Sequence, residues 1–187
     1  MPETEVELIR RYLQDAIAAE TSFESQLRSF AHEGGDDFEV QSLFFGHAAE
    51  TSRQIERLKY RLSELGGNPS GGKSSLAHLF SFAPKIAQAT HKPEEKLVQN
   101  LIIAFCVENG ERAMYEALAA TARSAADGVT EALAREIAAE ETVTAEKIWH
   151  FLPSRSKIAF NMLTPGEIDP SVDTRTTEDR IVDESLL

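Results

Sequence analysis

Residues 47–54 read HAAETSRQ and interrupt an otherwise apolar helical pattern. On either side of them, apolar residues recur at the three- and four-residue spacing of one helix face, namely Val40, Phe44, Ile55, Leu58, Leu62 and Leu65. His47, Glu50, Thr51 and Gln54 interrupt or border that face. The pattern therefore predicts a long helix with a polar cluster turned toward the core at its middle.

A similar run, AEET at residues 139–142, aligns Glu141 with Glu50. Glu20 lies 30 residues before Glu50, and Glu111 lies 30 residues before Glu141. This shared offset predicts a duplicated helical hairpin with one carboxylate on each helix.

Composition limits the class of protein. A chain of 187 residues with 42% hydrophobic content can form one domain with a substantial core. Glycine and proline gather at a few places between long Ala/Glu/Leu/Arg segments, which is typical of an all-α protein. The net charge of −12 repels nucleic acid, and no basic stripe reverses it locally, so we expect no nucleic-acid binding.

No apolar stretch approaches the ~20 residues of a membrane span, and the acidic N-terminus lacks a signal-peptide core. We therefore expect a soluble, cytoplasmic protein that does not enter membranes. The single cysteine, Cys106, excludes an intrachain disulfide, and the apolar run 101–105 before it predicts a buried, inert thiol.

Four helices are predicted, at about 3–31, 37–65, 92–126 and 130–152. Gly34 and Gly35 end the first, Asp36 or Asp37 caps the second, and Pro153 ends the fourth. Residues 66–92 fit the long crossover between the two hairpins of a ferritin-like bundle. One or two short helices are expected there, broken at Pro84 and carrying Leu76, Leu79, Phe80, Phe82 and Ile86.

We expect residues 1–153 to form this bundle and residues 154–187 to form a C-terminal extension. In the extension, an apolar patch at 158–163 is expected to dock, and a mobile acidic tail follows Pro165. The tail ends in apolar residues, which makes it a candidate docking peptide for a protein partner.

Carboxylates occupy core positions in the predicted helices, with Glu20 in the first, Glu108 and Glu111 in the third and Glu141 in the fourth. Burying such charges together is costly unless protons or cations intervene. A pair of divalent metal ions would remove the cost, and carboxylate with imidazole ligands suits iron, manganese or zinc. Helix bundles commonly hold two metals with one Glu from each of two helices and Glu-x-x-His from the other two.

The order of these segments resembles the YciE/YciF group of ferritin-like proteins over about residues 5–152. The matching motifs are Ala19-Glu20, His47-x-x-Glu50-Thr51 with Gln54, Val107-Glu108-x-x-Glu111, and Glu140-Glu141. The resemblance implies a ferritin-like four-helix bundle, a homodimer, a di-metal site and an association with bacterial stress responses. Carried over by position, the implied metal ligands are Glu20, His47, Glu50, Glu108, Glu111 and Glu141, with Glu140 as an alternate for the last.

The chain departs from the ferritin pattern at Arg53 and Thr144, where Glu-x-x-His would require histidines. Arg53 could neutralise two carboxylates without any metal. Tyr115, one turn after Glu111, could donate a hydrogen bond to a ligand carboxylate or simply pack in the core.

Two main hypotheses follow. The first is a di-metal carboxylate protein with iron as the expected metal. As an enzyme it would be a ferroxidase- or peroxidase-like oxidoreductase, and a hydroxylase on the same scaffold is a weaker variant. The second is a metal-free helical bundle that acts as a structural or interaction protein, in which the acids pair with Arg53, Arg112 or Lys147.

Overall fold

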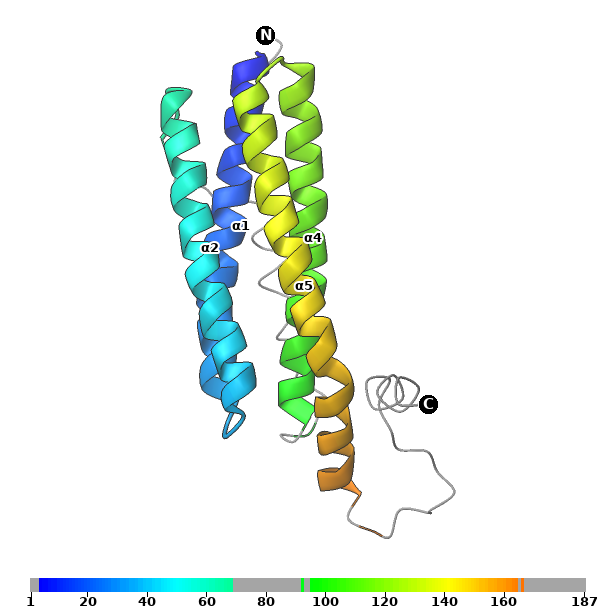
Figure 1. Cartoon of the computed structure of the whole chain (residues 1–187). Coiled ribbons are helices and arrows are strands. Elements are labelled where there is room, and N and C mark those ends of the chain that lie inside the picture. The colour runs from blue at the N-terminus through cyan, green and yellow to red at the C-terminus, as the bar shows by residue number, and fades with distance from the viewer. Residues whose placement is uncertain (1–3, 69–91, 93–94, 165, 167–187) are drawn as a thin grey trace, which may run out of the picture.

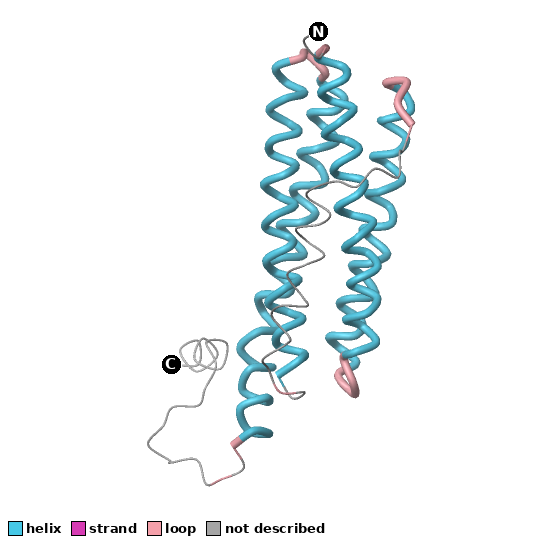
Figure 2. The backbone as a smooth tube through the Cα atoms, turned by 180° about the vertical axis from the view of Figure 1, so that it is seen from behind, coloured by secondary structure: helices cyan, strands magenta, loops and turns pink. Residues whose placement is uncertain are grey.

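The computed structural model describes residues 4–68, 92, 95–164 and 166. It contains four helices in this order: α1 (Glu5–Glu33), α2 (Phe38–Glu64), α4 (Lys96–Ser124) and α5 (Gly128–Leu163) (Figure 1). The described residues contain helices and loops and no strand (Figure 2). The predicted all-α, four-helix bundle is thus confirmed. The short helices predicted in the crossover and the tail after Pro165 lie outside the described residues, apart from Gly166.

The bundle consists of two helical hairpins. Contacts are densest within the pairs α1–α2 and α4–α5, and the hairpins meet where α1 packs on α4 and α2 on α5. Each hairpin turn ends in an aspartate that caps the following helix, because the Asp37 side chain accepts from Val40 N and the Asp127 side chain from Thr130 N. Between the hairpins, α2 and α5 share fewer contacts than α1 and α4.

The predicted ends of the first two helices are correct to within two residues, but the predicted end of the fourth is wrong. Helix α5 continues through Pro153 to Leu163. Proline removes one backbone donor from a helix, and contacts beyond it offset this loss. Arg155 donates to Asp37 over 2.8 and 3.0 Å and to Glu39 over 2.6 Å, and its guanidinium lies 4.6 Å from the Phe151 ring centroid.

The last turns of α5 therefore cross the predicted boundary between bundle and extension at residue 153. Ala159 is buried there, whereas Ile158, Phe160 and Met162 are more than half exposed.

The prediction that Cys106 is buried is also wrong, because its side chain is exposed. Leu101, Ala104 and Val107 occupy the inward face of α4, and the helical period turns Cys106 outward with Ile102. Among the described residues, no helix is long and apolar enough to span a membrane.

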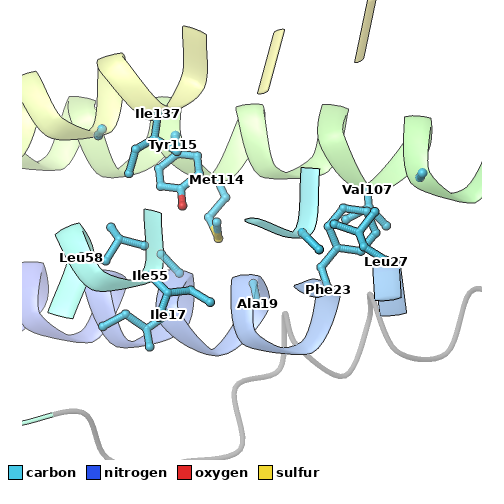
Figure 3. Packing of buried hydrophobic residues seen from close by; sticks show 14 of the residues in the cluster. Ile17, Ala19, Phe23, Leu27, Ile55, Leu58, Val107, Met114, Tyr115 and Ile137 are labelled. Carbon is cyan, nitrogen blue, oxygen red and sulfur yellow. The ribbon is translucent and has the colours of Figure 1, made fainter. Parts of the chain in front are cut away.

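The buried apolar side chains form one core, and those labelled in Figure 3 lie at different levels along the bundle. Phe23, Leu27 and Val107 lie at one level, and Ile17, Leu58, Tyr115 and Ile137 lie at another. In the chain, Glu20 falls between Ile17 and Phe23, and Glu108 and Glu111 fall between Val107 and Tyr115. The acids of α1 and α4 therefore lie at a level of the bundle that has an apolar layer on either side.

Candidate metal centre

Four glutamates, one each from α1 and α5 and two from α4, are buried in the middle of the bundle. Glu20, Glu108 and Glu111 have no exposed surface, and Glu141 is 1% exposed. His47 of α2 is also buried. The structure thus gathers five of the six implied ligands in the interior, as their positions in the apolar stripes predicted.

The closest group joins α2, α4 and α5. His47 Nε2 lies 2.6 Å from Glu108 Oε1, and one ligand atom from each of His47, Glu108 and Glu141 lies within 4.8 Å of the others. Three donor atoms at such separations could coordinate one cation between them.

Glu20 and Glu111 adjoin this group from α1 and α4. The Tyr115 hydroxyl donates a hydrogen bond to Glu20 Oε1, so the predicted contact between Tyr115 and a candidate ligand is confirmed. Glu111 is close enough to Glu20, Glu108 and Glu141 for their charges to raise its pKa.

Many polar atoms of the centre have no hydrogen-bond partner among the described residues. They are Glu20 Oε2, both ring nitrogens of His47, both oxygens of Glu108 and both oxygens of Glu111. Two of these seven atoms, His47 Nε2 and Glu108 Oε1, face each other at 2.6 Å, and the other five have no hydrogen-bond partner in the described parts of the chain. Buried polar atoms are nearly always satisfied in native proteins, so this cluster indicates a missing partner.

Electrostatics agrees with the geometry. Burial is the main cause that raises the pKa of Glu20, Glu108, Glu111 and Glu141. Repulsion among the acids adds to it, since the charge of Glu108 raises the pKa of Glu141 and the charge of Glu20 raises that of Glu108. Burial lowers the pKa of His47 despite the nearby acids, which leaves the imidazole neutral and able to bind a metal.

A second set of polar residues positions Glu141. Gln54 Nε2 donates to Glu141 Oε1 over 2.5 Å and to Glu140 Oε2 over 3.1 Å. Arg57 donates to both oxygens of Glu140, over 2.9 and 2.7 Å, and to Glu136 over 3.2 Å. Glu140, the alternate ligand, is therefore already neutralised by an arginine.

Arg57 is not among the site residues predicted from the sequence. A usable signal was present, because Glu50, Gln54 and Arg57 are spaced four and three residues apart and share one face of α2.

Glu50 lies at the edge of the centre and not inside it. Its side chain is 29% exposed, and its Oε2 lies 4.0 Å from His47 Nδ1. Thr144, which stands where ferritins would carry a histidine, is buried and donates to Glu50 Oε2 over 3.5 Å.

The alternative in which Arg53, Arg112 or Lys147 pairs with the buried acids has no support among the described residues. Arg53 and Lys147 are exposed, and neither forms an ion pair within residues 4–68 and 95–164. Arg112 donates to Asn109 and to none of the four buried glutamates. Carboxylates with a neutral imidazole form a donor set that suits iron, manganese or zinc, so the residues present fit a divalent metal.

Comparisons with known proteins agree with this fold. Residues 5–160 match the family described as "Domain of unknown function (DUF892)". The crystal structure of the E. coli stress protein YciF is 23% identical, with a TM-score of 0.69 over 87% of this chain and 98% of that one. This likeness, together with the family match, confirms the resemblance to the YciE/YciF group.

Two further structures share the fold. A crystal structure of a protein from Xanthomonas campestris pv. campestris is 22% identical, with a TM-score of 0.72 over 86% of this chain and 99% of that one. YcfI from Rhodopseudomonas palustris is 23% identical, with a TM-score of 0.70 over 78% of this chain and 93% of that one.

Proposed function

This chain belongs to the DUF892 family, and from its buried acids we propose that it binds divalent metal ions between its helices. We propose two ions per bundle, with iron as the physiological metal and manganese or zinc as alternatives. A four-helix fold does not by itself establish a function, so the proposal rests on the buried acids and not on the fold.

The observation that carries the proposal is the state of Glu108 and Glu111. Both side chains are fully buried, and their four carboxylate oxygens have no hydrogen-bond donor among the described residues. An unpaired buried carboxylate is costly, and no described arginine or lysine contacts either side chain. A divalent cation would supply the missing positive charge to both.

The residues divide into ligands and residues that hold the ligands. His47, Glu108 and Glu141 would hold one ion, since their donor atoms lie closest together. Glu20 and Glu111 would provide the additional carboxylates for a second. Tyr115 fixes Glu20 through its hydroxyl, and Gln54 fixes Glu141 through its amide.

Iron at this position would supply one-electron chemistry toward oxygen or peroxide. The apolar layers on both sides of the centre would keep bulk water away from it. Because the similar E. coli protein YciF is a stress protein, we place the proposed chemistry in a stress response.

Metal binding is tested by titrating the metal-free protein with Fe²⁺ under nitrogen, and with Co²⁺, Mn²⁺ and Zn²⁺. We expect about two equivalents to remain after gel filtration, measured by elemental analysis. At a hundredfold excess over Kd, binding stabilises the fold by about 2.7 kcal/mol. For a chain of this size, that raises Tm by roughly 5–10 °C.

Two variants and a control complete the experiment. Glu108→Gln and His47→Gln should lose the retained metal and the rise in Tm, while Glu146→Gln, an exposed acid on α5, should keep both. Retention of no metal by the unaltered protein, or an equal rise in Tm for all four proteins, would contradict the proposal.

A further inference from the structure

A pocket of about 520 Å³ opens between α2 and α5, beside the buried centre. Its wall includes Leu43 and Gly46 of α2 and Phe151 of α5, and it reaches His47, Glu50 and Thr144. α2 and α5 share fewer contacts than α1 and α4, so this is the more open of these two seams between the hairpins.

His47 separates the pocket from the centre. The ring lines the pocket, and its Nε2 lies 2.6 Å from Glu108 Oε1 on the inner side. Its Nδ1 is buried, has no hydrogen-bond partner among the described residues, and lies 4.0 Å from Glu50 Oε2. One imidazole therefore borders both spaces.

Glu50 is suited to accept a cation from solvent. It lines the pocket, its side chain is 29% exposed, and its only described hydrogen-bond donor is Thr144 at 3.5 Å. The other candidates are at most 4% exposed, except the alternate Glu140, whose two oxygens are already held by Arg57. Glu50 is thus the one candidate carboxylate that a hydrated ion can meet before it enters the interior.

Resting on the proposed metal site, we propose that this pocket is the entrance by which a divalent cation reaches the centre. Glu50 receives the ion from solvent, and His47 passes it to Glu108 and Glu141. Arg53 and Lys147 also line the pocket, and their positive charges slow the approach of a cation.

Gly46 offers a way to close the pocket without disturbing the fold. A Cβ built on Gly46 meets no atom within 4 Å. A helical side chain leans toward the N-terminus of its helix, so a leucine at 46 would cover the space near Leu43 and Ser42, which both line the pocket. Replacing a mid-helix glycine also favours the helix, so Gly46→Leu should fold.

The test measures the rate of Co²⁺ uptake by stopped-flow absorption. Gly46→Leu should slow the observed rate at least tenfold while the retained amount of Co²⁺ stays unchanged. Two controls should keep the original rate, namely Gly46→Ala, which adds one methyl group, and Ala113→Leu, on the exposed face of α4. Lys147→Gln should raise the rate, and high salt should remove that gain.

A second readout needs no metal. Diethyl pyrocarbonate modifies accessible imidazoles, and peptide mass spectrometry follows the modification of His47. Gly46→Leu should reduce the modification rate of His47 at least fivefold and leave that of His150, which is exposed on α5, unchanged.

The outcomes separate the two proposals. If the Gly46→Leu protein takes up Co²⁺ at the original rate, and diethyl pyrocarbonate modifies its His47 at the original rate, the proposed entrance is refuted. The proposed metal site is not affected by that result. If the unaltered protein retains no Co²⁺, the metal site fails and the proposed route fails with it, whatever the reactivity of His47.

Discussion

Acidic residues in the middle of the bundle and those at the turns of its two hairpins differ in their hydrogen-bond partners. At the turns, Asp127 accepts from Arg61 over 2.8 and 2.9 Å, and Asp37 accepts from Arg155 over 2.8 and 3.0 Å. Each aspartate also accepts from a backbone N–H as a helix cap. In the middle, the Glu108 and Glu111 carboxylates accept no hydrogen bond from any described residue.

The pKa values of the two sets of acids are shifted in opposite directions. Hydrogen bonds from Arg155 lower the pKa of Asp37. The pKa of Asp127 is lowered by its bonds to Thr130 and Arg61, which outweigh its partial burial. Burial raises the pKa of Glu108 and Glu111. The described residues thus supply partners to the acids at the turns and no hydrogen-bond donor to Glu108 or Glu111, which supports the proposed cation as the missing partner.

The largest effect is expected for Glu111→Gln in the metal-free protein at pH 7.5. Removing a buried ionisable group without a partner should stabilise the fold by about 1–4 kcal/mol. The raised pKa of Glu111 means that its contribution is fully favourable below the unfolded value of 4.5 and is lost as pH rises toward the folded value. The gain in unfolding free energy should therefore disappear at pH 4.

Urea unfolding at both pH values measures this gain, with Glu146→Gln as the exposed control on α5. A loss of stability in Glu111→Gln at pH 7.5, or the same gain at pH 4, would remove the contrast between the two regions.

A smaller effect of opposite direction is expected at the turns. Asp37→Ala removes a helix cap and the partner of Arg155, and should cost about 2 kcal/mol. Because the pKa of Asp37 is lowered, its contribution is present above the unfolded value of 3.8 and is lost as pH falls through the folded value. Asp36→Ala, at the neighbouring exposed position, should be nearly neutral. Equal unfolding free energies for the two variants would argue against a stabilising role of the Asp37 cap and its contact with Arg155.

Arg155→Ala should cost about 1 kcal/mol, since the cap at Asp37 remains and only the arginine contacts are lost. Amide hydrogen exchange should then rise in residues 154–163, because these contacts offset the proline in α5. Arg155→Lys should recover part of the protection. Unchanged exchange in the alanine variant would show that the last turns of α5 are held by other contacts.

The smallest effect is expected for Arg53→Ala in the metal-free protein. Arg53 is exposed and pairs with no acid in the described parts of the chain, so the change in unfolding free energy should stay within about 0.5 kcal/mol. A cost above about 1.5 kcal/mol would mean that Arg53 neutralises the centre after all, and that the acids there have a partner within the chain.

The fold and most of the centre follow from helical periodicity. Glu20, Glu108, Glu111 and Glu141 each replace an apolar residue in a regular stripe, and all four are buried. The wrong predictions concern features that helical periodicity does not report, such as contacts between helices. Pro153 predicts the end of the fourth helix, whereas α5 continues past it, where Arg155 contacts the start of α2.

Two placements depended on how the helices rotate against one another. Glu50 borders the stripe of α2, and only the packing of α2 on α5 decides that it stays partly exposed beside Thr144. Arg57 likewise pairs with Glu136 and Glu140, which lie about 80 positions away in the sequence. A local sequence pattern cannot predict a contact over that separation. The apolar run 101–105 predicts that Cys106 is buried, but on the helical period this position faces outward, and its side chain is exposed.

The division of the bundle into two hairpins gives the centre a role in folding order. Each hairpin is one continuous stretch, Glu5–Glu64 or Lys96–Leu163, and can collapse from local contacts. Glu20 and His47 come from the first, and Glu108, Glu111 and Glu141 from the second. A cation bound between them would be a cross-link that closes only after the halves have docked. Metal would then lengthen the lifetime of the native state while leaving the speed of its formation almost untouched.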